Sequence, residues 1–169
     1  MINLVNIAEE NLKRKINLDF TKNYSENNIS IKILPYLRGL IARISKKYCK
    51  NNKWIFDIRN NASTYELFQK SNLTELIKLG VATPDHVIRT KAKPLLIEPY
   101  TPKQDASNKE IKSWLEKTEI QIRKYIKEYE DYFIRNATLS NDNKKQLDPI
   151  PRLILIPYIG LIGLGFDKK

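Results

Sequence analysis

The sequence predicts an α/β fold, a mixed sheet with flanking helices. Three observations favour it. Several segments place apolar residues at helical spacing, short β-rich apolar runs alternate with them, and the chain ends in two such runs around Gly160. The 169 residues are 41% hydrophobic, which suffices for one globular core.

The first 28 residues are expected to stand apart from this fold. Residues 1–14 place apolar side chains, from Leu4 to Leu12, on one face of a helix. Residues 15–28 are polar and contain the loop-like stretch NYSENN, so we interpret them as a linker. The α/β domain is therefore expected to span residues 29–169.

The first half of this domain is predicted to hold two helical regions around one strand. The stretch ISIKILPYLRGLIARISKKY at 29–48 is amphipathic, and Pro35 is expected in the first turn of its helix, where a missing N–H costs little. A short strand is expected at Trp54–Ile58. Residues 63–80 have a helical pattern that ends at Gly80.

The second half is predicted to add strands and the longest helix. A turn at Thr83–Asp85 is expected to lead into a strand at Val87–Thr90 and a second apolar run at Leu95–Ile97. Residues 109–136 repeat apolar side chains at helical spacing over their whole length. Two strands are expected to flank the turn at Gly160.

The stretch TPDHVIRTK supplies the candidate binding residues His86, Arg89 and Lys91. On a strand, alternate side chains point to opposite faces, so Arg89 and Lys91 share one face and His86 lies on the other. Arg89 and Lys91 can together clamp a carboxylate or a phosphate. The alternative is a charged, solvated face, and a single histidine is more often structural than catalytic.

The sequence offers no complete set of catalytic, metal or cofactor residues. Its one histidine and its one cysteine, Cys49, fall short of the three or four ligands of a zinc site. Gly160, Gly163 and Gly165 reverse the spacing of the dinucleotide fingerprint, so we interpret them as a turn between strands. No serine or cysteine is paired with a base in a recognisable motif.

The charge and the apolar runs limit the possible partners and location. The net charge is +11 and the pI about 9.6, but lysines alternate with acids along the chain, so we do not expect nucleic-acid binding. No apolar run is long enough to cross a membrane. A single cysteine suits a reducing compartment, and a cytoplasmic protein is expected.

Several stretches resemble one known family. The segments PYLRGLIAR, LGVATPDHVIRTKAKPLLI, YFIRN and LDPIPRLILIPYIGLIGLGFDKK are similar, in order and spacing, to the fused class II aldolase/short-chain dehydrogenases of the rhamnulose-1-phosphate aldolase/alcohol dehydrogenase type. The resemblance covers residues 33–169. Residues 1–14 resemble the terminal helix of the preceding aldolase region.

This resemblance implies a middle segment of the fused protein, cut on both sides. Residues 29–169 would be a class II aldolase-like half-domain, truncated at its C-terminal end. The family's zinc histidines lie upstream of this segment, and its NAD-binding glycine loop and Tyr-x-x-x-Lys pair lie downstream. The resemblance implies flanking aldolase and dehydrogenase domains as partners, a homo-oligomeric parent protein, and no zinc or NAD in this chain itself.

Three functions follow as hypotheses. The first is a fragment of a bifunctional sugar-phosphate aldolase/NAD-dependent short-chain dehydrogenase of deoxy-sugar catabolism, in which this segment connects the catalytic domains without a complete active site of its own. The second is a stand-alone module that binds an anion such as a sugar phosphate. The third is a basic nucleic-acid-binding protein.

Overall fold

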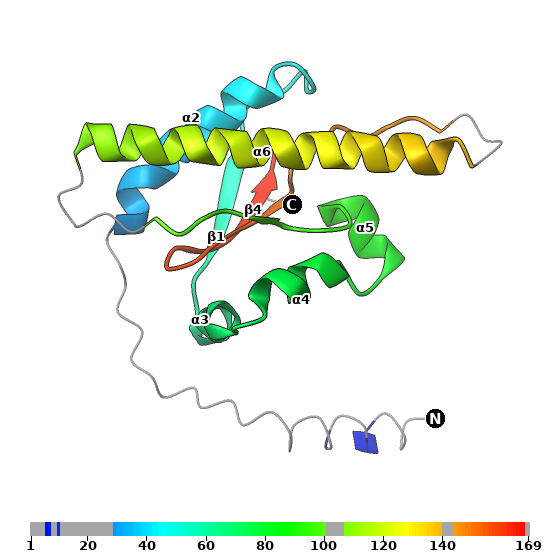
Figure 1. Ribbon diagram of the computed structural model, residues 1–169, viewed down its shortest axis with the longest axis horizontal. Helices are drawn as coiled ribbons and strands as arrows, with labels where there is room; N and C mark the ends of the chain where they lie inside the picture. Colours follow the sequence, from blue (N-terminus) through cyan, green and yellow to red (C-terminus); the bar gives the residue numbers. More distant parts are fainter. Residues whose placement is uncertain (1–5, 8–9, 11–28, 101–106, 140–143, 168–169) are drawn as a thin grey trace.

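The computed structural model describes residues 6, 7, 10, 29–100, 107–139 and 144–167. The predicted linker at 15–28 and most of the predicted helix at 1–14 lie outside the described residues. Within the described part, the helices and strands follow one another in the order α2, β1, α3, α4, α5, β2, α6, β3, β4 (Figure 1). The mixed α/β prediction is therefore confirmed.

The sheet has four strands in the spatial order β1-β4-β3-β2. The strands are β1 (Ile55–Arg59), β2 (Leu95–Leu96), β3 (Leu153–Ile156) and β4 (Gly160–Gly165). Strand β4 pairs antiparallel with both β1 and β3, and β2 pairs parallel with β3. Strand β2 lies at the edge of the sheet, so β3 is its one neighbouring strand in the sheet.

The turn between β3 and β4 depends on Gly160, as the sequence predicted. Gly160 has a φ of 135°, and a Cβ there would lie 2.6 Å from the backbone oxygen of Arg59 on β1. A glycine at this position therefore lets β4 approach β1 closely. Gly163 and Gly165 lie within β4, which places the glycine triplet in a turn and a strand.

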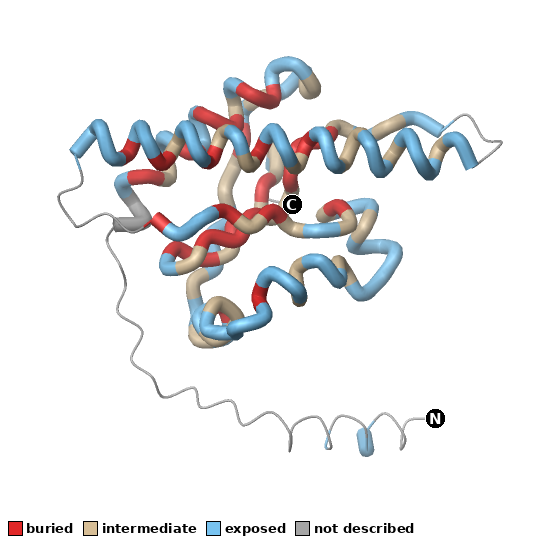
Figure 2. Tube along the Cα trace, viewed as in Figure 1, coloured by how far each residue is buried: buried red, intermediate tan, exposed pale blue. Residues whose placement is uncertain are grey.

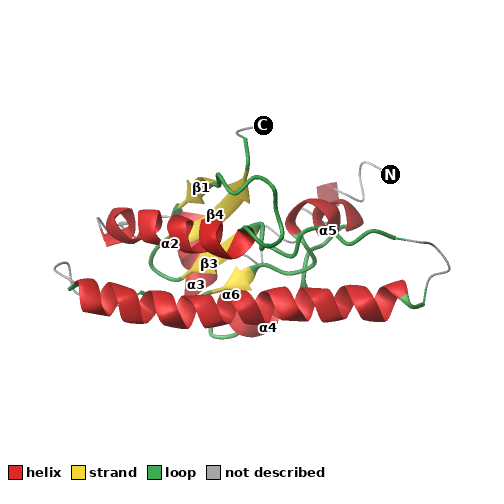
Figure 3. Cartoon of the chain, turned by 90° about the horizontal axis from the view of Figure 1, so that it is seen from above, coloured by secondary structure: helices red, strands yellow, loops and turns green. Residues whose placement is uncertain are grey.

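Two helices supply most of the apolar surface that covers the sheet. Helix α2 (Ile29–Ser45) and helix α6 (Asn108–Ala137) contact each other, and α6 runs along the whole domain (Figure 3). Helix α6 begins with a capping box, in which Ser107 and Glu110 each bond to the other's backbone N–H. The core that these helices build with the sheet includes Leu37, Ile41, Ile122, Ile126, Ile154, Ile156 and Ile162.

Burial along α6 stops well before the helix ends (Figure 2). Its buried side chains end at Ile126, although the apolar pattern continues through Tyr129 to Phe133. Tyr132 and Ile134 are 42% and 58% exposed. The last third of α6 therefore carries aromatic and apolar side chains past the edge of the core.

Two details of the predicted helices need correction. Pro35 lies in the second turn of α2, because the helix begins at Ile29. The helical pattern at 63–80 is divided into α3 (Ala62–Gln69) and α4 (Leu73–Leu79). The side chain of Asn61 caps α3 by accepting a hydrogen bond from the Thr64 N–H, and Gly80 ends α4 with a φ of 81°.

The predicted strand at Val87–Thr90 is wrong, because Pro84–Thr90 forms helix α5. Thr83 is its N-cap, with an extended backbone and a side chain that accepts a hydrogen bond from the His86 N–H. Pro84 follows at the first helical position, where its fixed φ fits a helix and its missing N–H costs nothing. Threonine followed by proline is a helix-start signal, and it outweighs the β-branched residues of this short segment.

Candidate functional site

His86 and Arg89 lie on the exposed surface of α5, and each is engaged locally. The hydroxyl of Thr83 lies 2.7 Å from Nδ1 of His86. The guanidinium of Arg89 pairs with the carboxylate of Asp85 at 3.0 Å, with both side chains at least 70% exposed. An exposed ion pair one helical turn apart contributes about 0.3–0.5 kcal/mol to stability, so this pair adds little to the stability of the domain.

Lys91 occupies a different environment, although it lies only two residues beyond Arg89. It follows the end of α5 and is only 3% exposed. Its ammonium lies 4.7 Å from the centre of the Tyr129 ring on α6. Because the strand is absent, the argument that Arg89 and Lys91 share a face is wrong. Whether any of the three residues contacts an anion stays a prediction.

The backbone of Lys91 is strained. Its φ of 71° and ψ of 168° fall in a region that is open essentially to glycine alone. Such conformations cost about 1–3 kcal/mol and concentrate at binding and catalytic sites. Lys91 therefore combines a buried cation with a conformation that the surrounding structure must impose.

A groove of about 1000 Å³ opens beside Lys91. It lies between α4, the segment that carries β2, and the C-terminal half of α6, which run near one another in Figure 1. Its apolar surface includes Ile77, Leu95 and Leu96, and three tyrosines of α6 line it as well: Tyr125, Tyr129 and Tyr132. A concave apolar surface with a few converging polar groups is typical of ligand sites.

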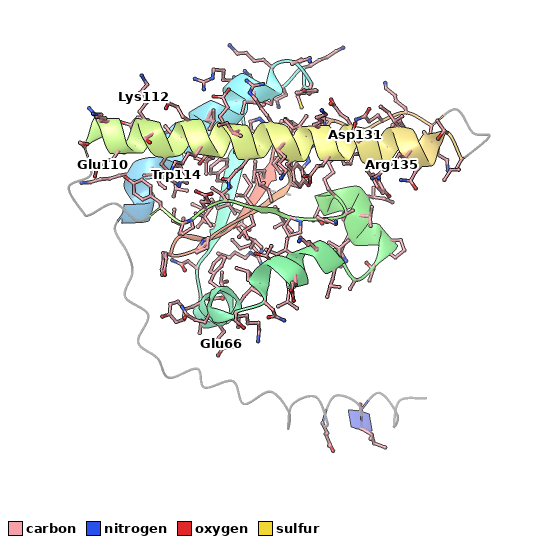
Figure 4. The ribbon with its side chains drawn as sticks, in the orientation of Figure 1. Glu66, Glu110, Lys112, Trp114, Asp131 and Arg135 are labelled. Carbon is pink, nitrogen blue, oxygen red and sulfur yellow. The ribbon has the colours of Figure 1, made fainter. Side chains whose placement is uncertain are left out.

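Basic side chains outnumber acidic ones around this groove. The lining residues with a positive charge are Lys78, Lys91, Lys93, Lys124 and Arg135, and those with a negative charge are Glu128 and Asp131. Figure 4 labels Asp131 and Arg135 near the C-terminal end of α6. Lys124 and Glu128 approach each other to 3.9 Å, which is a weak pair on an exposed helix face.

Helix α6 holds the wall of the groove that contains β2. The hydroxyl of Tyr125 donates a hydrogen bond to the backbone oxygen of Lys93 at 2.7 Å, and the indole N–H of Trp114 donates to that of Glu98 at 3.2 Å. Burial raises the pKa of the Tyr125 phenol, which therefore stays a donor at neutral pH. The β2 segment is thus fixed to α6 on both sides of the strand.

An ion pair between Arg152 and Asp148 influences the charge of Lys91. Arg152 bonds to the carboxylate of Asp148 at 2.6 Å, and its guanidinium lies over the rings of Trp54 and Phe166, 4.9 and 5.3 Å from their centres. Burial lowers the pKa of Lys91, the carboxylate of Asp148 opposes this shift, and the charge of Arg152 adds to it. The negative charge of Asp148 is therefore shared between Arg152 and Lys91.

The thiol of Cys49 belongs to the same region. Burial raises its pKa, and the nearby carboxylate of Asp148 raises it further. The thiol is therefore held in its protonated, weakly nucleophilic form. The charges of Arg152 and Lys91 oppose the rise in this pKa only in part.

The described residues do not fit a metal or dinucleotide site. Among them, no group of three or more histidine, cysteine, aspartate and glutamate side chains is arranged to hold a metal ion. The glycine triplet runs into strand β4, whereas a dinucleotide loop opens a helix. No helix among the described residues is long and apolar enough to cross a membrane.

Sequence reasoning identified Lys91 but missed the other groove residues. Tyr129, Tyr132 and Arg135 belong to the continuation of the α6 pattern past the core. The signal for this site was the presence of three tyrosines at the C-terminal end of one amphipathic helix.

Comparisons with known proteins place the chain in a wider context. The family model described as "Aldolase class II, second domain" matches residues 28–169. The chain is 27% identical over 133 residues to the "Uncharacterized oxidoreductase YuxG" of Bacillus subtilis (strain 168). That alignment covers 79% of this chain and 17% of the relative, so the chain spans less than a fifth of the relative's length. No solved structure matches the chain significantly.

Proposed function

This chain belongs to the family of class II aldolase second domains, and we propose that it is a connecting domain without a complete active site of its own. The parent protein would be a bifunctional sugar-phosphate aldolase/NAD-dependent short-chain dehydrogenase of deoxy-sugar catabolism. In it, this domain would pack the two catalytic domains against each other. The cytoplasm is the compartment we propose for the parent protein.

One observation carries the proposal. The region that matches an aldolase domain also aligns with a much longer protein whose name is oxidoreductase. A single domain related to both chemistries is consistent with a fusion of an aldolase and a dehydrogenase. His86 is hydrogen-bonded to Thr83, and Arg89 forms an ion pair with Asp85. These local contacts agree with a domain that has no catalytic residues on α5.

Zinc and NAD would belong to the flanking domains of the parent protein. Zinc there would polarise the substrate carbonyl of the aldol reaction, and NAD would accept the hydride of the oxidation. We assign neither group to the residues of this chain, because the donor arrangement described above does not fit them. A homo-oligomeric parent protein remains part of the proposal.

The test compares this chain with its longer context. Purified alone, the chain should show neither cleavage of rhamnulose 1-phosphate nor NAD-dependent oxidation of lactaldehyde. Aldolase and dehydrogenase domains, expressed separately from a longer relative, should co-purify with the chain when all three are produced together. Steady turnover of either substrate by the isolated chain, with an active-site variant of the longer protein as the blank, would refute a connecting role.

The DNA that flanks the reading frame provides an independent check. A His-x-His aldolase segment upstream and a glycine-rich dehydrogenase segment downstream are expected. Flanking reading frames with no relation to either enzyme would contradict the proposal even if the isolated chain were inactive.

A further inference from the structure

We propose that the groove beside Lys91 binds a small organic anion, a phosphate monoester or a carboxylate with an apolar or aromatic body, with the Lys91 ammonium as its anchor. This inference goes beyond the connecting role and does not depend on it. It keeps the anionic ligand that the sequence predicted, but it moves the site from the exposed face of α5 to the groove between α4, β2 and α6.

The charge of Lys91 is the first step. Burying an ammonium without a carboxylate partner is costly, because the protein replaces its water shell only in part. The ammonium lies over the face of the Tyr129 ring, and the nearby carboxylate of Asp148, which balances part of its charge, is also bonded to Arg152. Two cations, Lys91 and Arg152, thus share one carboxylate, and a bound anion would supply a second countercharge.

The backbone of Lys91 is the second, independent step. Strained conformations of this kind concentrate at binding and catalytic sites, and Lys91 adopts one beside the groove. Glycine at this position would relieve the strain and would also remove the buried charge. The strained backbone therefore supports a binding role for Lys91 at the groove.

The shape of the groove gives the class of ligand. Lys93, Lys124 and Arg135 line it from two elements and add positive potential around Lys91. The groove is also lined by apolar and aromatic side chains, those of Leu95, Leu96 and the α6 tyrosines. A ligand with an apolar or aromatic body would bury this surface, whereas a purely polar anion would leave it exposed to water. The volume of about 1000 Å³ accommodates a small organic molecule.

The probes are phenyl phosphate and phenylacetate, with glycerol phosphate, inorganic phosphate and benzyl alcohol as comparators. Calorimetric titration of the full 169-residue chain at low salt should show saturable binding of at least one aromatic anion. Its affinity should exceed those of inorganic phosphate and benzyl alcohol by about tenfold or more, because each comparator lacks one half of the recognised structure. The two aromatic probes distinguish phosphate from carboxylate, and glycerol phosphate tests whether a polyol can replace the aromatic body.

The variants localise the site. Lys91→Met and Lys91→Gly should each weaken binding by about tenfold or more, the loss expected for one charge-assisted contact. The glycine variant relieves backbone strain, so its loss of binding could not be ascribed to misfolding if its melting temperature is at least that of the parent. Lys112→Met, an exposed lysine near the N-terminal end of α6 (Figure 4), is the matched control and should bind as the parent does.

Amide resonances give the second readout. Ligand-induced shifts should concentrate at residues 91–96 and 125–135. Undiminished binding in both Lys91 variants, shifts confined to α5, or no saturable binding of either aromatic anion would overturn the proposal.

Discussion

The ammonium of Lys91 lies 4.7 Å from the centre of the Tyr129 ring, and this contact joins the end of α5 to α6. A lysine over an aromatic ring is attracted by the partial negative charge that the ring's quadrupole places on its face, and the attraction grows when water is excluded. Since Lys91 is almost fully buried, this contact offsets part of the cost of burying its charge.

The ring of Tyr129, rather than its hydroxyl, is expected to matter for stability. Tyr129→Leu should lower the free energy of unfolding by about 1–2 kcal/mol, whereas Tyr129→Phe should change it by less than about 0.5 kcal/mol. Urea denaturation of both variants measures this. In a Lys91→Met background the loss caused by Tyr129→Leu should shrink, and an unchanged loss there would show that the cation contributes nothing.

The backbone strain at position 91 should appear as a difference between glycine and alanine there. Lys91→Gly and Lys91→Ala both remove the buried charge, the contact with Tyr129 and the packing of the side-chain stem, but only glycine relieves a backbone strain of about 1–3 kcal/mol, which exceeds the entropy that glycine adds to the unfolded chain. The glycine variant should therefore unfold at higher urea than the alanine variant. Equal midpoints for the two would mean that the backbone at position 91 is relaxed.

The stability difference between the parent and Lys91→Met should depend on pH. The pKa of Lys91 lies below its usual 10.5 because the side chain is buried. Between that lowered pKa and 10.5 the unfolded chain binds the proton that the folded chain has released, so stability rises with pH. The deficit of the parent should therefore be largest near neutral pH and should shrink as the pH rises toward about 10.

The groups around Lys91 do not reverse this expectation. Cys49 and Tyr129 have raised pKa values, which lower stability at alkaline pH. Both proteins carry these groups, so their effects largely cancel in the difference. A difference that stays constant from about pH 7 to 10 would contradict a lowered pKa at Lys91.

The sequence predicted most elements of the fold because their signals are local. The spacing of Trp114, Ile122 and Ile126 places one face of a helix in the core, and the structure confirms a helix from Asn108 to Ala137. The alternation around Gly160 likewise predicted two strands and a tight turn. Strand order and pairing could not be predicted, since β1 and β4 are about a hundred residues apart.

The candidate site was predicted less well, because it depends on contacts between distant segments. Lys91 and Tyr129 are far apart in the sequence, and nothing local indicates that one lies over the other. At α5, the β-branched Val87 and Ile88 favoured a strand, while the cap at Thr83 and the proline at 84 decided for a helix. Lys91 is buried at the C-terminal end of this helix, so its burial could not be predicted while the segment was interpreted as a strand.

The ion pair of Arg152 with Asp148 should be a major source of local stability. Arg152→Met leaves Asp148 half-buried without its partner, so the free energy of unfolding should fall by about 2–4 kcal/mol. Arg152→Lys should restore little of it, since an ammonium lacks the planar surface that lies over Trp54 and Phe166. Thermal denaturation measures both variants.

The double variant Arg152→Met/Asp148→Asn tests whether the unpaired carboxylate of Asp148 causes this loss of stability. Without a charge at position 148, the loss should be smaller than in Arg152→Met alone, because no uncompensated carboxylate remains. A double variant that is less stable than Arg152→Met would show that the other interactions of Asp148, the hydrogen bond from the Ile150 N–H and the attraction to Lys91, outweigh the cost of its unpaired charge.

The hydroxyl of Thr118 is buried in α6 without a hydrogen-bond partner among the described residues. A buried polar group in this state costs about 1–3 kcal/mol, and valine has nearly the same shape without the hydroxyl. Thr118→Val should therefore raise the free energy of unfolding by about 1 kcal/mol in urea denaturation. Thr138→Val is the control, because the Thr138 hydroxyl is exposed and donates to the backbone oxygen of Arg135, so its loss should be neutral or slightly destabilising. If Thr118→Val is less stable than the parent, the hydroxyl is hydrogen-bonded in solution, for instance to a bound water, and that hydrogen bond contributes to the stability of the core.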